Sequence, residues 1–180
     1  MTRPIRTKTM SRRDVLFSLF GRWRRSDAPS RGVGFDVQSR EIETKLAEED
    51  FQAAAELLEE LLAKSPDHIQ AMQKLAYCRY KLGLPEEGLE LLNTVQSLKP
   101  TDNFTALYLG LILCRLERLD EAMNAWRDYF NIDQPVIQRA INLQLTLFEM
   151  DGPSAAQEVA QAVEEAISEQ ERLDRQSAWG

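Results

Sequence analysis

The stretch ALYLGLILCRLERLDEAMNAW, residues 106–126, decides the fold of this chain. Its first half places apolar residues at helical spacing around Leu109 and Gly110, and its second half does the same around Ala122 and Trp126. The two halves meet at the polar residues 117–118. We therefore expect two short amphipathic helices that pack closely against each other, with the small residues allowing the approach and the large ones filling the space beside them.

The same pattern recurs along the chain with a period of 34 residues, which is typical of stacked structural units. A small residue lies in the first turn of each second helix, and in most units a bulky residue follows four positions later. Pro66 and Pro100 close two of the units, where a proline ends one helix and opens the next. The columns in phase are Ala54, Gly88, Ala122, Ala156; Leu58, Leu92, Trp126, Ala160; Leu75, Leu109, Leu143; and Phe51, Pro85, Leu119, Pro153.

These columns resemble the tetratricopeptide repeat, whose pattern places L-G, an aromatic, a small residue, a bulky residue and a closing proline at fixed offsets. The third unit matches best, through Leu109-Gly110, Ala122 and Trp126. The resemblance covers residues 35–170 and weakens in the first and fourth units, as end units of solenoids do. It implies an all-α protein, a right-handed superhelical solenoid of antiparallel helix pairs with three to four units and a C-terminal capping helix.

Prolines, glycines and capping residues set the expected helix boundaries. After Ile167 the last helix becomes strongly polar, so we expect its end to project into solvent. The chain divides into a basic N-terminal arm with a short helix and a linker, residues 1–34, and a repeat domain, residues 35–180. The expected helices cover residues 36–48, 51–64, 68–82, 85–98, 102–116, 119–131, 135–150 and 153–174.

By the same resemblance, the first helix of each unit lines a concave face, and concave faces of solenoids bind partners. On the helix that carries Phe104, Leu107 and Leu111, a different face already holds the row of residues expected to be buried. We therefore expect these three side chains to stay exposed. A partner helix or an extended peptide with Leu or Phe anchors suits such a groove. The expected groove residues are Tyr77, Tyr80, Lys81, Phe104, Leu107, Leu111, Arg115, Ile141, Leu145 and Phe148.

The arm and the rest of the chain carry opposite charge. Residues 1–32 hold nine Lys/Arg against two Asp, whereas the remainder holds 13 basic and 27 acidic residues. Within the arm, SRRDVLFSLFGRWRR, residues 11–25, has a capped start, an apolar stripe and a basic end, which predicts a short amphipathic helix. We expect this helix to dock on this chain's groove or on an acidic partner, through Arg12, Arg13, Leu16, Phe17, Phe20 and Trp23.

Other roles compete with docking for residues 11–25. The segment resembles a twin-arginine export signal, but its apolar region is short and no A-x-A-like cleavage site follows. It also resembles the start of ferredoxin-like accessory proteins of bacterial nitrate reductase, without their iron–sulfur cysteines. Binding to a membrane surface and self-association through the arm stay as alternatives, whereas the acidic body argues against nucleic acid as a partner.

Catalytic, metal and cofactor motifs do not stand out in the sequence. His68 follows Pro66-Asp67 at a helix start, where a capping role is expected. Neither a Gly-rich phosphate loop nor an H-E-x-x-H pair occurs, so we expect no enzyme, no cofactor and no metal. Cys78 and Cys114 lie in apolar helical patterns, which predicts buried thiols of a reducing compartment. No apolar run is long enough to span a bilayer.

Together these features predict a bacterial, cytoplasmic adaptor or assembly factor without enzymatic activity. It would bind a partner's helix or peptide in the concave groove. The alternative is a scaffold peripheral to the inner membrane, anchored by the basic amphipathic helix of residues 11–25.

Overall fold

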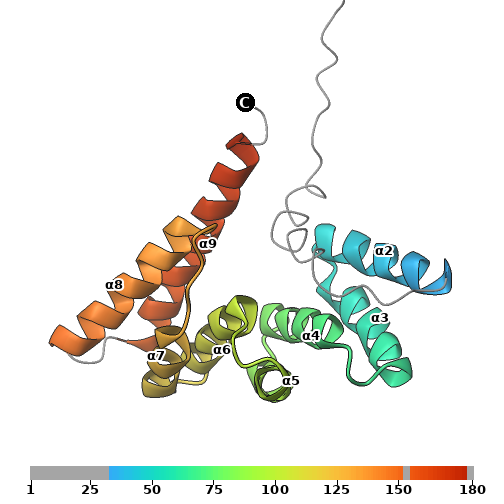
Figure 1. Cartoon of the computed structure of the whole chain (residues 1–180), viewed down its shortest axis with the longest axis horizontal. Coiled ribbons are helices and arrows are strands. Elements are labelled where there is room, and N and C mark those ends of the chain that lie inside the picture. Colours follow the sequence, from blue (N-terminus) through green and yellow to red (C-terminus); the bar gives the residue numbers. More distant parts are fainter. Residues whose placement is uncertain (1–32, 152–154, 178–180) are drawn as a thin grey trace, which may run out of the picture.

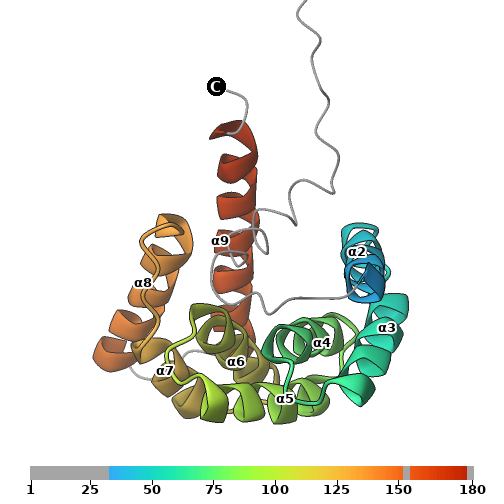
Figure 2. The ribbon, with the colours of Figure 1, turned by 45° about the vertical axis from the view of Figure 1, so that its right-hand side comes forward.

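The computed structural model of the protein describes residues 33–151 and 155–177, and within these ranges its regular elements are all helices. Each helix packs against the next, and α4 also meets α6, which confirms the all-α solenoid. The stack curves, with α5 and α7 on its outer side and α9 rising from its inner side (Figures 1 and 2). The expected docking helix of the arm lies outside the described residues. The helices are α2 (Val33–Ala47), α3 (Phe51–Lys64), α4 (Ile69–Lys81), α5 (Pro85–Leu98), α6 (Asn103–Arg115), α7 (Leu119–Arg127), α8 (Pro135–Asp151) and α9 (Ala156–Ser177).

The turn inside a unit has the same backbone geometry three times. Glu49, Gly83 and Glu117 stand 34 residues apart and adopt left-handed φ angles of 58°, 74° and 57°. After each of them, the next N–H reaches back to a carbonyl near the end of the preceding helix and closes it. These bonds run from Asp50 to Lys45 (3.0 Å), from Leu84 to Arg79 (2.9 Å) and from Arg118 to Leu113 (2.9 Å).

Three of the four columns form the centre of the core, apart from Leu143, whereas in the fourth column Leu119 is buried and Phe51 and Pro85 are half-buried. The small residues near the start of each second helix are buried in all four units, and so are the residues four positions after them. Leu75 and Leu109 are buried as well, whereas their equivalent in the fourth unit, Leu143, is 54% exposed. The helix starts agree too, since His68 Nδ1 accepts the Ala71 N–H at 3.2 Å, which confirms the expected cap.

Three helices depart from their expected bounds, while the other five agree to within one residue. The helices α2 and α9 begin at Val33 and Ala156, three residues from the expected positions. The helix α7 ends at Arg127 instead of residue 131. After this end, the Gln138 side chain on α8 hydrogen-bonds the backbone in place of further helix. It accepts from the Asn131 N–H (2.8 Å) and donates to the Tyr129 carbonyl (3.2 Å).

The fourth unit does not continue the regular stack. The helix α8 packs mainly on α9 and only marginally on α7, while α9 packs on α6. Val159, Val163 and Ile167 of α9 are buried in this contact region. Gln170 is buried beyond them and accepts the Val136 N–H at 3.0 Å, so the solvent-exposed end of α9 begins later than expected. The C-terminal helix therefore fills part of the concave side before it projects.

Candidate protein-binding surface

A row of aromatic rings runs from α3 across α4 to α6. Tyr108 lies at its centre, with ring centroids 5.2 Å from Tyr77, 6.1 Å from Tyr80 and 4.4 Å from Phe104. Phe51 extends the row, 5.7 Å from Tyr77. Most of these pairs meet edge to face, the arrangement that the charge distribution of the rings favours. The row ties three helices together, with Tyr77, Tyr80 and Tyr108 buried and Phe51 and Phe104 partly exposed.

Two cations lie over this row. The Lys81 ammonium is 5.6 Å from the Tyr77 ring centroid, and the Arg115 guanidinium is 5.2 Å from that of Tyr80. Both positions were expected to face the groove, and both side chains are exposed. A cation over a ring face is attracted by the negative face of the π-system. The aromatic row therefore has charged residues along its accessible edge.

Glu164 joins α9 to the aromatic row. Its carboxylate accepts hydrogen bonds from the Tyr80 hydroxyl and, at 2.8 Å, from the Arg115 guanidinium. Burial acts to raise the pKa of Glu164, but the bonds from Tyr80 and Arg115 outweigh it and hold the pKa below its ordinary value. The contact joins Tyr80 of the aromatic row to α9, the helix that rises from the inner side of the stack (Figure 2).

A buried polar cluster fixes α4 against α6. The Gln73 amide donates to Asp102 at 2.6 Å and to the Thr105 hydroxyl at 3.0 Å. Asp102 also caps α6 by accepting the Thr105 N–H at 2.9 Å. Every member of the cluster has a hydrogen-bond partner, so burial leaves none of these side-chain donors or acceptors unsatisfied. The inner helices are thus held at a defined spacing.

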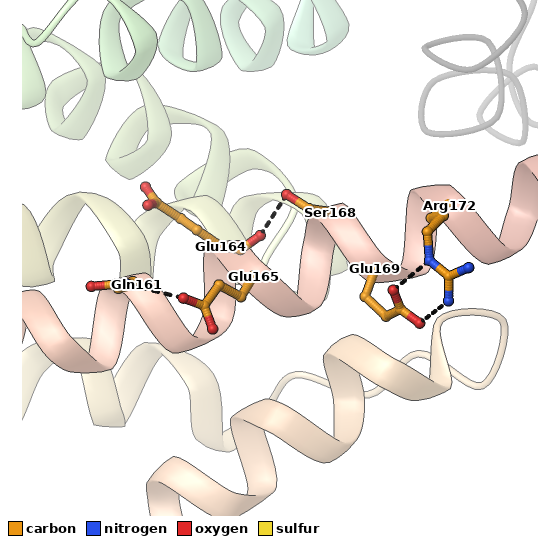
Figure 3. A pocket seen from close by; sticks show the side chains of 6 residues that line it. All are labelled: Gln161, Glu164, Glu165, Ser168, Glu169 and Arg172. Carbon is orange, nitrogen blue, oxygen red and sulfur yellow. Dashed lines mark hydrogen bonds and ion pairs between the residues drawn. The ribbon is translucent and has the colours of Figure 1, made fainter.

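An acidic row on α9 lines a shallow, open depression whose described lining residues all belong to this one helix (Figure 3). Glu169 is bound by Arg172 at 2.7 Å, and Glu165 accepts from Gln161 at 2.9 Å. The sequence shows these carboxylates at helical spacing but does not indicate that their helix turns back onto the concave side. The described residues that line the depression are Gln161, Glu164, Glu165, Ser168, Glu169 and Arg172.

The expected groove is only partly an open surface. Leu107 and Leu111 are 4% and 0% exposed, so the expectation that this row stays exposed is wrong. Leu107 and Leu111 belong to the same core as the apolar residues of α9, which packs on α6. Charged substitutions at these two positions would therefore test the fold and not binding. Of the remaining expected residues, Tyr77, Tyr80 and Ile141 are buried, Phe104, Leu145 and Phe148 are half-buried, and Lys81 and Arg115 are exposed.

Comparison with known protein families agrees with the stacked helix pairs of the fold. Residues 45–111 match the Tetratricopeptide repeat family. The matched range runs from the end of α2 into α6 and includes all five rings of the aromatic row. Tetratricopeptide repeats generally bind other proteins and are generally not catalytic. No curated protein matches the chain.

Two further observations concern the described part of the chain. Across residues 33–151 and 155–177, no group of three His, Cys, Asp or Glu side chains is placed to hold a metal ion. None of the described helices combines the length and the apolar character needed to cross a membrane.

Proposed function

We propose that the chain is a protein-interaction module whose concave face binds a basic, amphipathic helix or extended peptide of a partner. One observation carries this proposal. Glu164 contacts Tyr80 in the aromatic row and also lines the acidic depression, so the two surfaces are continuous. Apolar anchors of the ligand would lie against the rings, and its basic residues would face the carboxylates of α9.

The contact surface differs in part from the groove expected from the sequence. We assign contact with the apolar anchors of the ligand to Phe104, which is partly exposed, and to the aliphatic stems of Lys81 and Arg115, which are exposed. Tyr77 and Tyr80 form the floor beneath them, and Glu165 and Glu169 supply the negative charge. Leu145 and Phe148 pack against the core and hold the fourth unit, so they have no part in this contact.

The arm provides a ligand of the right chemistry. Residues 11–25 combine Arg12, Arg13 and further arginines with the anchors Phe17, Phe20 and Trp23. Opposite net charge favours its encounter with the acidic remainder of the chain. A synthetic peptide of residues 11–25 is therefore a suitable probe of the concave face, whether the natural occupant is the arm or a partner.

The test uses the full chain with Phe17, Phe20 and Trp23 replaced by Ser, so that its own arm does not compete. Fluorescence anisotropy of the labelled peptide measures binding. We expect the Glu165→Lys/Glu169→Lys variant to weaken binding at least about tenfold, because like charges now meet. The matched control is Glu86→Lys/Glu90→Lys on α5, which should bind normally. Equal loss in both variants would show nonspecific charge attraction and refute the proposal.

A cellular experiment tests the role as adaptor or assembly factor. A photoreactive amino acid replaces Phe104 on the concave face or, as control, Leu98 on α5, which is 52% exposed. We expect a protein to be cross-linked from position 104 and not from position 98. Identical products from the two positions would contradict recognition by the concave face.

The peripheral membrane scaffold is the rival proposal, and it rests on the aromatic and basic residues of 11–25. Flotation with anionic vesicles separates the two functions. If the intact chain floats and the Phe17→Ser/Phe20→Ser/Trp23→Ser variant does not, the arm is a membrane anchor. If neither floats, the interaction module remains and the anchor is excluded.

A further inference from the structure

Tyr77 in the aromatic row lies within electrostatic reach of carboxylates from two distant parts of the chain. Burial is the main cause that raises the pKa of its hydroxyl, and Glu171 on α9 and Glu49 after α2 raise it further. The two carboxylates also act on each other. Since α2 and α9 stand on opposite sides of α4 (Figures 1 and 2), the ring has negative charge on both sides.

No described cation binds Glu171 directly. The residue is half-buried, and Lys81 and Arg175 attract its carboxylate only through space, without a hydrogen bond. Burial outweighs this attraction, so the pKa of Glu171 lies above its ordinary value. Glu164, two turns earlier on α9, is by contrast bound by Arg115 at 2.8 Å. A guanidinium of a ligand would therefore give Glu171 the charge-assisted hydrogen bonds that the described residues do not supply.

We propose that the arm of the same chain, through residues 11–25, occupies the aromatic row between Glu49 and Glu171 and keeps the concave face closed to partners. The proposal rests on concave-face binding and adds its regulation. Charge favours this occupant, because residues 1–32 hold nine Lys/Arg against two Asp, whereas the remainder holds 27 acidic and 13 basic residues. The aromatic residues of the arm would lie against the partly exposed rings of the row, and its arginines would reach the two carboxylates.

The arm is long enough to reach this place from the point where it joins α2. That point is Val33, whereas Glu49 follows the other end of the helix. The 15 residues of α2 separate the two by about 22 Å. Residues 26–32, which link the arm to α2, span up to about 25 Å when extended. Residues 11–25 can therefore run back along α2 to the aromatic row.

The repeat pattern does not continue into the arm as a further helix pair. Phe17 is in phase with Phe51, but Phe20 takes the position that Ala54 has in the first unit. Ala54 is fully buried, and a small residue is needed there for two helices to approach closely. The arm is thus not suited to extend the stack, and its aromatic residues remain available to dock on a surface.

Binding of the labelled peptide of residues 11–25 tests whether the face is closed. Anisotropy compares the intact chain with the anchor-free chain, Phe17→Ser/Phe20→Ser/Trp23→Ser. We expect the intact chain to bind at least about tenfold more weakly, because a short linker gives the arm an effective concentration in the millimolar range. The matched control, Arg3→Ser/Arg6→Ser/Lys8→Ser, places three serines outside the segment and should bind as weakly as the intact chain.

The outcomes separate this inference from the proposed function. Equal, measurable binding to the intact and anchor-free chains would overturn the closed state and leave concave-face binding in place. No binding to either chain would refute concave-face binding, and the closed state with it. In the anchor-free chain, Glu171→Gln should weaken the peptide about fivefold, whereas Glu158→Gln, at an exposed position of the same helix, should not. Equal binding by these two variants would contradict the position beside Glu171.

Cross-linking of the purified intact chain tests whether the arm acts within its own molecule. A photoreactive amino acid at position 104 should cross-link to residues 11–25 of the same chain, with a yield that does not change on dilution. The same group at position 98 on α5 should not reach the arm. Covalent dimers, or a yield that falls on dilution, would show that a second copy supplies the arm and would overturn the inference.

Discussion

Gly110 and Trp126 meet so closely that the glycine has no room for a side chain: a Cβ at Gly110 would lie 2.1 Å from the indole Nε1. The ring is fully buried, and its Nε1–H donates to the Leu107 carbonyl at 3.1 Å. Because the tryptophan is held by both packing and this bond, it cannot move aside. The pair sets the approach of α7 to α6 in the third unit.

Gly110→Ala should therefore destabilise the fold by about 3 kcal/mol, at the upper end of what overpacking costs in a dense core. Gly88→Ala is the matched control, since a Cβ there would lie 2.9 Å from Ile112 Cδ1 and 3.2 Å from the Ala76 carbonyl oxygen, both much longer than the contact at Gly110. We expect Gly88→Ala to cost about 1 kcal/mol. Urea unfolding followed by circular dichroism measures both. Equal losses would show that the contact with Trp126 is not the cause.

The left-handed residues in the repeated turn predict a stabilising substitution. Glu117 has φ 57°, and the equivalent Gly83 has φ 74°. A non-glycine residue in this region costs roughly 1–2 kcal/mol of folding free energy. Glycine avoids this cost, but part of the gain is lost because glycine has more conformational freedom in the unfolded chain. Glu117→Gly should thus stabilise by about 0.5–1 kcal/mol. Glu90→Gly inside α5, the same chemical change at helical φ, should instead lower the free energy of unfolding by about 1 kcal/mol.

The ion pair that holds α9 to the concave face predicts a pH-dependent stability. Bonds from Tyr80 and Arg115 lower the folded-state pKa of Glu164 below its ordinary value of 4.5. Its contribution is therefore fully present above pH 4.5 and is lost as the pH falls through the lowered pKa. Burial raises the pKa of Glu171, so the contribution of Glu171 to stability changes with pH in the opposite direction. The pH dependence of the wild type alone therefore does not isolate the effect of Glu164.

The measurement compares urea midpoints of the wild type and of Glu164→Gln from neutral pH down through the acid range. We expect the glutamine variant to be less stable at neutral pH and the difference to shrink on acidification. Glu165→Gln, the exposed neighbour on α9, should follow the wild type. A difference between wild type and Glu164→Gln that stays constant with pH would contradict a charge-dependent tether.

Both cysteines should be unreactive in the folded protein. Burial raises the pKa of Cys78 and of Cys114 to about 12, so neither carries an appreciable thiolate fraction near neutral pH. With a thiol-reactive dye we expect no labelling of the native chain and labelling of both thiols in denaturant. If the native chain is labelled, single Cys→Ser variants identify which thiol has reacted. Rapid labelling of either thiol in the native chain would show that its helix opens locally.

The sequence predicted most of the local structure and much less of the surface. The 34-residue columns placed the helices, the buried Ala54 column and the cap at His68, because these depend on spacing within one unit. The end of α7 was missed, since its bonds come from Gln138 on the next helix. The prediction that Leu107 and Leu111 are exposed was wrong, because the burial of a side chain depends on which helix lies opposite it.

By itself, the sequence determined a chain of helix pairs whose small and bulky residues alternate in a fixed phase, since helical periodicity and close packing are local requirements. Only the tertiary structure decided where the fourth unit goes. It turned α9 onto α6, placed Glu164 against Tyr80 and left Leu143 exposed on α8. These outcomes follow from competition between surfaces far apart in the chain, and a repeating pattern carries no information on that competition.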